Sequence, residues 1–339
     1  MPEGHSVHRV ALQFQRDFVG HTILTSSPQG RFSEGASVLD GLTLREAKAV
    51  GKQMFLGFDV AGPNAGLDSG LWLRVHLGIY GAWDFAGIVS PLFSAAEGGA
   101  DSGGAHSVGA PRGAGARSGV QYASEGQRRN VRVSEDERDL GVPLDETFPH
   151  EPVGAVRVRL LTEATVADLR GPTACEVLDA AAVQIVLNRL GPDPVTDVGP
   201  TAGPTAGPKA EQRFVDAVAR RKVPIGQLLM DQSIVAGIGN VYRAEMLFRA
   251  GLNPYTPGNL VPIDTVRALW RDWCELLPIG IREGRMLTRL GADAPLEDTR
   301  AERYWVYKRE GLPCRRCGAN IRLDVMGARK LYWCPGCQN

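Results

Sequence analysis

The sequence lacks the features that mark membrane and secreted proteins. No apolar run approaches the ~18 residues that a membrane-spanning helix needs. The first residues, MPEGHSVHRVALQF, hold no apolar core of signal-peptide length followed by a small-residue cleavage site, which predicts a cytoplasmic protein without a membrane partner. The formal net charge at pH 7 is zero, so the whole-chain charge neither supports nor excludes an anionic partner.

Cysteine is scarce and unevenly placed. Of six cysteines in 339 residues, Cys175 and Cys274 stand alone, which excludes a disulfide framework. The other four form two C-x2-C pairs separated by sixteen residues: Cys314, Cys317, Cys334 and Cys337. Each pair presents two sulfurs from one tight turn, and two pairs complete a closed tetrahedral shell. The spacing therefore predicts one zinc ion with a structural role, because four thiolates leave no open coordination position.

The zero net charge hides a basic C-terminal region. Residues 300–339 contain nine lysines and arginines against three acids. Phosphate neutralisation depends on where the cations lie, so this region favours a nucleic-acid partner for the zinc module. Zinc modules of this kind also mediate protein contacts, which stays open as an alternative.

The N-terminal half is expected to be mainly β-structure after one helix. Apolar side chains at helical spacing over residues 4–18 predict an amphipathic helix, and residues 21–85 alternate short β-rich runs with glycines. Residues 94–151 contain few large apolar side chains, so we expect a disordered insertion that cannot offset its ordering entropy. Strand-like sequence resumes at 153–161, and a helix or turn is expected over 164–171.

The C-terminal half is expected to be helical and then metal-bound. Gly, Pro and Thr repeats over residues 191–209 predict an interdomain linker, and helical periodicity follows to about residue 286. Strand-like runs at 304–307 and 331–334 accompany the cysteines. The predicted domains are a β-rich domain over 1–190, a helical domain over 210–297 and a zinc module over 298–339.

A glycine-rich junction separates two apolar helical stretches of the helical domain. Gly237 and Gly239 permit a tight turn and close backbone approach, and Asn240 is suited to cap the helix that follows. The free N–H groups of such a helix start favour an anion such as a DNA phosphate. An ordinary helical corner without a ligand is the alternative.

The first residues of the chain suggest a reactive amine. Removal of Met1 would leave Pro2 with a secondary amine, and the predicted helix begins directly afterwards, which would hold that amine against the domain. An α-amino group has an ordinary pKa of about 8, so a useful fraction is neutral and nucleophilic. The alternative is a tail without function.

Four segments together resemble one family. They are MPEG at the start, DQSIVAGIGNVYRAEMLFRAGLNP over 231–254, VYKREGLPCRRCG over 306–318 and YWCPGCQ over 332–338. In order and spacing they are similar to the formamidopyrimidine-DNA glycosylase/endonuclease VIII family. The resemblance implies an α+β fold, with an N-terminal β-sandwich flanked by helices, a helix–two-turn–helix domain and a C-terminal zinc finger hairpin.

The family's functional residues transfer to matching positions. The resemblance implies that Pro2 attacks C1′ of a damaged nucleotide, that Glu3 protonates the sugar ring oxygen, and that Lys52 contacts phosphates and assists catalysis. Asn240, with Gly239 beside it, and Arg329 match the residues that clamp the phosphates around the flipped nucleotide.

A base that leaves the stack must be replaced by a protein side chain. Ile79 and Tyr80 lie where the family keeps this void-filling wedge, and we predict that role for them. The alternative is that Leu77 and Ile79 are core residues of a strand and that Tyr80 sits at its turn. His5 and His8 match no catalytic position of the family and are assigned no role.

The PEG opening and the stretch over 287–311, which lacks a Gly-Gly-Thr-Thr-type loop, favour the endonuclease VIII branch and oxidised pyrimidine substrates. The implied activity is that of a bifunctional DNA glycosylase and abasic-site lyase of base excision repair. Its partner would be double-stranded DNA with oxidised bases or abasic sites, with single-stranded or bubble DNA as further substrates, and the protein would act as a monomer. Two alternatives are a non-catalytic damaged-DNA-binding member and a zinc-ribbon adaptor for proteins.

Overall fold

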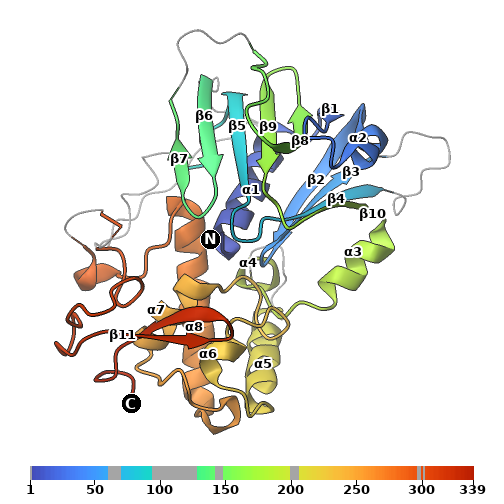
Figure 1. Ribbon diagram of the computed structural model, residues 1–339. Helices are drawn as coiled ribbons and strands as arrows, with labels where there is room; N and C mark the ends of the chain where they lie inside the picture. The colour runs from blue at the N-terminus through green and yellow to red at the C-terminus, as the bar shows by residue number, and fades with distance from the viewer. Residues whose placement is uncertain are drawn as a thin grey trace, which may run out of the picture.

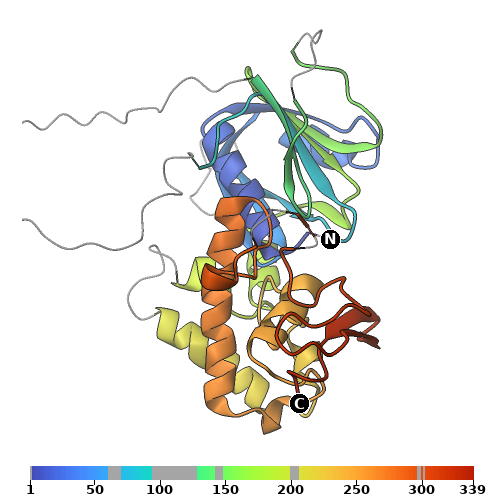
Figure 2. The same ribbon diagram turned by 90° about the vertical axis from the view of Figure 1, so that its left-hand side faces the viewer.

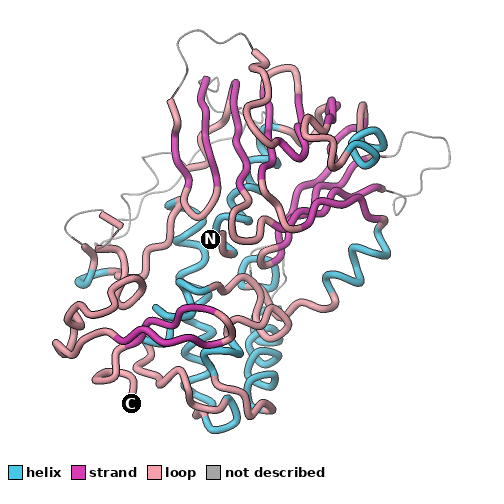
Figure 3. The backbone as a smooth tube through the Cα atoms, viewed as in Figure 1, coloured by secondary structure: helices cyan, strands magenta, loops and turns pink. Residues whose placement is uncertain are grey.

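The computed structural model describes residues 2–59, 70–93, 128–141, 148–198, 206–295, 299–300 and 302–339. Figure 1 shows an N-terminal sheet domain above a helical domain, with a two-stranded hairpin on one side of the helices. The tube in Figure 3 separates the same regions by secondary structure, with strands in the upper half and most helices in the lower half. This α+β arrangement confirms the predicted fold class.

The N-terminal domain is built on a ten-stranded antiparallel network. Its order is β10-β4-β3-β2-β1-β8-β9-β5-β6-β7, and β1 pairs with β2 on one side and β8 on the other. Because β1 joins both halves, the two halves fold over a shared core as a sandwich. The bounds are β1 (Thr22–Ser26), β2 (Leu42–Val50), β3 (Gln53–Phe58), β4 (Leu71–His76), β5 (Ala82–Ile88), β6 (Arg128–Val133), β7 (Glu137–Asp139), β8 (Val156–Leu161), β9 (Thr165–Arg170) and β10 (Ala174–Leu178).

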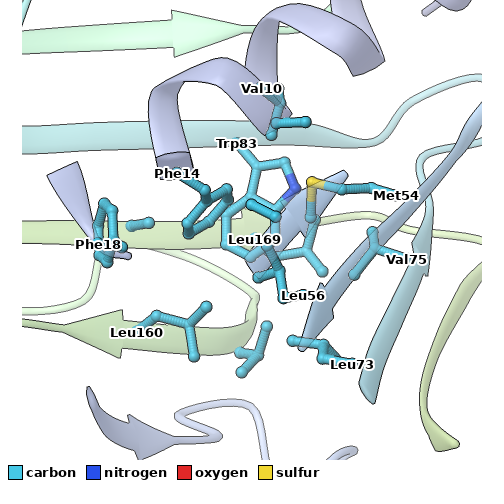
Figure 4. Close-up of a cluster of buried hydrophobic side chains, with 14 of the residues drawn as sticks. Val10, Phe14, Phe18, Met54, Leu56, Leu73, Val75, Trp83, Leu160 and Leu169 are labelled. Atoms are coloured by element: carbon cyan, nitrogen blue, oxygen red, sulfur yellow. The ribbon is translucent and has the colours of Figure 1, made fainter. Parts of the chain in front are cut away.

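The sandwich core is closed by the first helix, α1 (Gly4–Asp17). Its apolar face buries Val10 and Phe14 against Trp83 of β5, with ring centroids of Phe14 and Trp83 4.9 Å apart. Figure 4 shows these side chains meeting Met54 and Leu169 from opposite halves of the sheet. Because truncating a buried aromatic ring costs about 3–5 kcal/mol, this packing fixes the start of the chain against the domain.

Two shorter helices complete the sheet domain. They are α2 (Ser33–Leu39) and α3 (Ala180–Leu187), and α3 packs its Val183 against Phe55 and Trp72. Asp179 caps α3 by accepting a hydrogen bond from the Ala182 N–H group.

Two sequence predictions for this half are wrong. Strands β6 and β7 lie within residues 94–151, where a disordered insertion was expected, while 94–127 and 142–147 lie outside the described residues. Strand β6 needs few apolar residues because only alternate side chains, such as Val131 and Val133, enter the core. Residues 165–170 form strand β9 and not a helix or turn. The sequence did not predict this because β9 is buried between β8 and β5 and therefore lacks the alternation of apolar and polar residues that marks a half-exposed strand.

The C-terminal helices enclose a second apolar core around Trp270 and Trp273. Helix α4 and the start of α5 lie inside the segment 191–209 that was predicted as a linker, and residues 199–205 lie outside the described residues. The elements are α4 (Pro194–Val198), α5 (Ala206–Ala219), α6 (Ile225–Leu228), α7 (Asn240–Arg249), α8 (Ile263–Glu283) and the 3-10 turns Gly258–Leu260 and Gly291–Asp293.

The last segment is a hairpin of β11 (Arg322–Met326) and β12 (Arg329–Trp333), which lies beside α7 in Figures 1 and 2. Residues 304–307 are not the predicted strand. Their N–H groups are held by one buried carboxylate, Glu245 of α7, which accepts from Trp305, Val306 and Tyr307. Among the described residues, no helix is both long and apolar enough to cross a bilayer.

Candidate active site and DNA interface

The start of the chain is fixed at the glycine-rich junction between the domains. The Gly4 N–H group donates to the Gly237 carbonyl oxygen over 2.9 Å, and Pro2 and Glu3 are buried. A Cβ atom on Gly4 would lie only 2.9 Å from the Gly237 Cα atom, so Gly4 is needed for this close approach, and Gly237 is suited to its φ of 94°. Residue 2 is therefore held between the sheet domain and the helices.

Glu3 binds the first turn of α7. Its carboxylate accepts hydrogen bonds from the N–H groups of Gly239, at 2.9 Å, Val241, at 2.8 Å, and Tyr242, at 3.3 Å. A Cβ atom at Gly239 would come within 2.3 Å of the Glu3 Cδ atom, which explains the glycine there. Burial raises the pKa of Glu3, against the opposing effects of Lys52 and the backbone donors.

This arrangement differs from the expected DNA contact at the helix start. The N–H groups of Gly239, Val241 and Tyr242 are bound to the Glu3 side chain, so the acceptor at this helix start is a protein carboxyl group and not a DNA phosphate. The sequence did not reveal this because the two partners are more than 230 positions apart.

Lys52 lies in the turn between β2 and β3. Its neighbour Gly51 has a φ of 58°, and a Cβ atom there would lie 2.8 Å from the Ala236 Cβ atom and 2.9 Å from the Gly237 nitrogen. The turn is thus packed on the same junction as Glu3. Burial lowers the pKa of Lys52 to about 8, with Glu3 opposing that change and Arg329 adding to it.

Asn240 and the strand that carries Arg329 are joined by a residue that the sequence analysis missed. Buried Arg243 donates from Nη2 to the Asn240 Oδ1 atom, at 2.5 Å, and to the Lys330 carbonyl oxygen, at 2.9 Å. Lys330 follows Arg329 at the start of β12, so one guanidinium joins the helix start to the hairpin. Burial lowers the pKa of Arg243 to about 10.

Ile79 and Tyr80 lie in the turn between β4 and β5, which is close to the start of the chain in both ribbon views. Tyr80 is 87% exposed and Ile79 39% exposed, whereas Leu77 is buried. Ile79 is therefore not a core residue of a strand. Among the described residues, neither side chain takes part in a hydrogen bond, an ion pair or a ring contact, so both remain at the surface.

The four predicted zinc ligands are brought together. The sulfur atoms of Cys314, Cys317, Cys334 and Cys337 all lie within 4.8 Å of one another, with the pairs Cys314–Cys337 at 3.8 Å and Cys317–Cys334 at 3.4 Å. Sulfur ligands at the usual zinc distance are separated by about 3.8 Å in a tetrahedron, so the donor set fits one zinc ion. The Arg316 backbone N–H group donates a hydrogen bond to the Cys314 sulfur, and such a bond stabilises a thiolate ligand.

The two unassigned histidines are both buried. The His5 Nε2 atom lies 2.8 Å from the Glu135 carbonyl oxygen, and burial lowers the pKa of His5 to about 4. His8 faces Asp193, a residue from the segment before α4.

Comparison with known proteins identifies three family regions in the chain. Residues 1–116 match the formamidopyrimidine-DNA glycosylase N-terminal domain, residues 198–290 match the formamidopyrimidine-DNA glycosylase H2TH domain, and residues 311–339 match the zinc finger found in FPG and IleRS. The regions occur along the chain in the order of the sheet domain, the helices and the hairpin.

Relatives and solved structures agree with these matches. The chain is 35% identical to Endonuclease 8 1 of Mycobacterium tuberculosis over 344 residues, covering 100% of both chains. It is also 35% identical to formamidopyrimidine-DNA glycosylase of Thermus thermophilus over 156 residues, which cover 45% of this chain and 55% of that protein.

The fold is similar to that of Lactococcus lactis Fpg in complex with an abasic site containing DNA, with a TM-score of 0.63, 19% identity and 99% coverage of both chains. Fpg of Thermus thermophilus aligns with a TM-score of 0.61 and 22% identity, over 99% of this chain and 98% of that one. With a whole-length relative at 35% identity and all three family regions in place, the chain belongs to the formamidopyrimidine-DNA glycosylase/endonuclease VIII family, the DNA glycosylases of base excision repair.

Proposed function

We propose that this chain is a bifunctional DNA glycosylase and abasic-site lyase whose nucleophile is the amine of Pro2. The observation that carries the proposal is the attachment of the chain start to the domain junction. Gly4 is bonded to Gly237, and Glu3 is held by the first turn of α7 with Lys52 beside it. A tail without function would need none of these buried contacts.

The first half of the reaction is base excision. After removal of Met1, the Pro2 nitrogen attacks C1′ of the damaged nucleotide, the bond from C1′ to the base breaks, and the departing base takes up the proton that the Pro2 nitrogen loses. Glu3 gives its proton to the sugar ring oxygen, and burial, which raises the pKa of Glu3, supports this role because it favours the protonated form. The ring opens, and a positively charged iminium joins Pro2 to C1′.

The second half is strand cleavage. The iminium is an electron sink, so a C2′ proton becomes acidic and its removal expels the 3′ phosphate. A second elimination expels the phosphate on the 5′ side, and water then releases Pro2 from the sugar. Lys52, with its pKa lowered to about 8, supplies a group beside Glu3 that assists these proton transfers.

DNA would be held by groups around this centre. Lys52, Asn240 and Arg329 would contact the phosphates that flank the flipped nucleotide, and Arg243 would keep Asn240 and the hairpin in register. Because the Gly239 N–H group is engaged by Glu3, Gly239 would act by permitting close approach of the backbone. Ile79 and Tyr80 would fill the gap in the stack.

The proposed substrates are oxidised pyrimidines, such as thymine glycol and 5-hydroxyuracil, in double-stranded DNA. Support comes from the PEG opening and from the whole-length similarity to Endonuclease 8 1. Abasic sites and single-stranded or bubble DNA would be further substrates. The protein would act as a monomer.

The test compares purified protein on thymine glycol duplexes and on 8-oxoguanine paired with cytosine. We expect faster excision of thymine glycol and strand cleavage at abasic sites. Much faster excision of 8-oxoguanine would contradict the substrate assignment. Borohydride reduction separates the lyase from a non-catalytic binder, because only a lyase is captured as a covalent adduct.

Glu3→Gln keeps the size of the side chain but removes the transferable proton. We expect this variant to lose base excision by about 100-fold or more and to keep much of its cleavage of preformed abasic sites, because the ring proton matters most before the base has left. Full excision by Glu3→Gln would contradict the role of Glu3. Asp179→Asn, which changes a carboxylate that caps α3, is the matched control.

A further inference from the structure

Asp193 is a fully buried carboxylate at the junction of three elements. It lies just before α4 in the segment that the sequence analysis interpreted as a linker. Its Oδ2 atom accepts a hydrogen bond from the Gly51 N–H group at 2.6 Å and lies 2.8 Å from the His8 Nε2 atom. Its Oδ1 atom accepts from the Val195 N–H group at 2.8 Å. A spacer would not need a buried charge with this many partners.

The Gly51 contact fixes the turn that carries Lys52. The positive φ and tight packing of Gly51 leave its N–H group buried, where a missing acceptor would be costly. Asp193 supplies that acceptor from the far side of the domain junction. The position of the Lys52 backbone is therefore set by the carboxylate next to it.

His8 connects the same carboxylate to the helix of the chain start. It lies on α1 four residues after Gly4, the first residue of the helix, a rise of about 6 Å. Both partners are buried, His8 to 5% and Asp193 to 0% exposure, and their pairing compensates for the burial of the charge. Helix α1, the Lys52 turn and the segment before α4 thus meet at one side chain.

We propose that Asp193, with His8, is a positioning residue that sets the Lys52 turn in register with the Pro2–Glu3 end of α1. The proposal rests on the proposed function, because it gives Lys52 a place in the reaction. Asp193 acts through Lys52 and touches no DNA.

A double-mutant cycle tests this coupling in the full-length chain. Asp193→Asn keeps the shape of the side chain, but its single oxygen cannot serve both Val195 and the Gly51–His8 side. We expect single-turnover excision of thymine glycol to fall about tenfold or more in Asp193→Asn, and the same change to have little further effect in a Lys52→Ala background. Equal fold losses in both backgrounds would overturn the proposal.

A second measurement does not depend on activity. Titration of the Lys52 ε-amine by NMR should give a pKa near 8 in the wild-type chain and a value nearer that of an ordinary lysine in Asp193→Asn, because a displaced turn exposes the amine. Asp179→Asn should leave the titration unchanged. If the Lys52 pKa in folded Asp193→Asn stayed at the wild-type value, the proposal would also be overturned.

Substitutions of His8 test the same coupling and do not depend on whether Asp193→Asn folds. His8→Gln keeps a donor toward Asp193 and should retain near wild-type excision, whereas His8→Leu should lose activity in the wild-type background but not in Lys52→Ala. Loss of activity in both His8 variants with an unchanged Lys52 titration would contradict the proposed coupling. A wild-type chain inactive on every oxidised or abasic substrate would instead refute the proposed function, while the titration would still report on the turn.

Discussion

The pKa values of Glu3 and Lys52 depend on their buried surroundings. Glu3 is an acid whose pKa is raised because it is buried, although three backbone donors and Lys52 act in the opposite direction. Lys52 is a base whose pKa falls to about 8 for the same reason. Burial thus raises the pKa of the acid and lowers the pKa of the base, which brings the two values closer together.

Tyr80 offers a direct test of the wedge. It is 87% exposed, so Tyr80→Ala should leave thermal stability unchanged. We expect the variant to excise thymine glycol from duplex DNA about tenfold more slowly, because an unfilled gap disfavours the flipped state, and to lose less on single-stranded DNA. Leu260→Ala, at 66% exposure, is the control. Unchanged duplex kinetics in Tyr80→Ala would remove the wedge assignment.

His5 predicts a pH dependence of stability. Its pKa in the folded chain is lowered from 6.5 to about 4, so the unfolded chain binds more protons between these values. The stabilising contribution is present above pH 6.5 and is lost as the pH falls toward 4. Between pH 7 and pH 5 the loss should be about 2 kcal/mol in urea unfolding, and His5→Gln should lack it. A wild-type chain with the same pH slope as His5→Gln would show that His5 titrates normally.

At the residue scale, the sequence was informative where a motif carried the signal. The four cysteines were predicted from spacing alone and do lie close enough together to hold one zinc ion, whereas the roles of Pro2, Glu3 and Lys52 rest on the resemblance to a family and stay a prediction. Asp193 and Arg243 were missed because their partners lie far along the chain, 142 residues away for Gly51 and 87 for Lys330. The available signals were an aspartate inside a predicted linker and an arginine on the buried face of an apolar helix.

The element that organises the site is α7. Its first turn holds Glu3, its Arg243 holds the zinc hairpin, and its Glu245 accepts hydrogen bonds from three consecutive N–H groups before the first cysteine pair. That last contact explains why residues 304–307 form no strand although their sequence is strand-like. Their donors are satisfied by a side chain in place of a neighbouring strand.

Arg243→Met should separate the helix start from the hairpin. The change leaves the Asn240 amide oxygen and the Lys330 carbonyl oxygen without their donor, which costs about 2–4 kcal/mol of stability. We expect affinity for damaged duplex DNA to fall about tenfold, measured by fluorescence anisotropy. Arg249→Met, on the same helix but paired with Asp272 of α8, should lose stability without losing affinity. Equal affinity losses in both variants would point to general destabilisation.

Across the whole molecule, the two domains meet through polar contacts at the end of α8. Arg9 of α1 donates to the Ile281 and Arg282 carbonyl oxygens at the end of α8, and the Glu137 N–H group of β7 donates to the Gly284 carbonyl oxygen. Strand β7 belongs to the segment that was predicted to be disordered. Composition did not reveal it because a charged edge strand can be held by a neighbouring domain.

Zinc removal tests the contribution of the C-terminal module. The module packs on α7 through Phe248 and Trp305, whose rings stack with centroids 5.3 Å apart. We expect one zinc ion per chain by elemental analysis, and loss of it in Cys337→Ser should lower DNA affinity at least tenfold, because the Arg329 turn loses its support. Cys175→Ser should keep both zinc and affinity. DNA binding that survives complete zinc removal would show that the hairpin is not required.

The most direct test maps the covalent intermediate. The full-length chain is incubated with abasic duplex DNA and borohydride, digested with protease, and the adduct is located by mass spectrometry. We expect the reduced sugar on the nitrogen of Pro2, and no adduct when that nitrogen has been acetylated beforehand. An adduct on Lys52 or another amine, or an undiminished yield from the acetylated chain, would contradict the Pro2 mechanism.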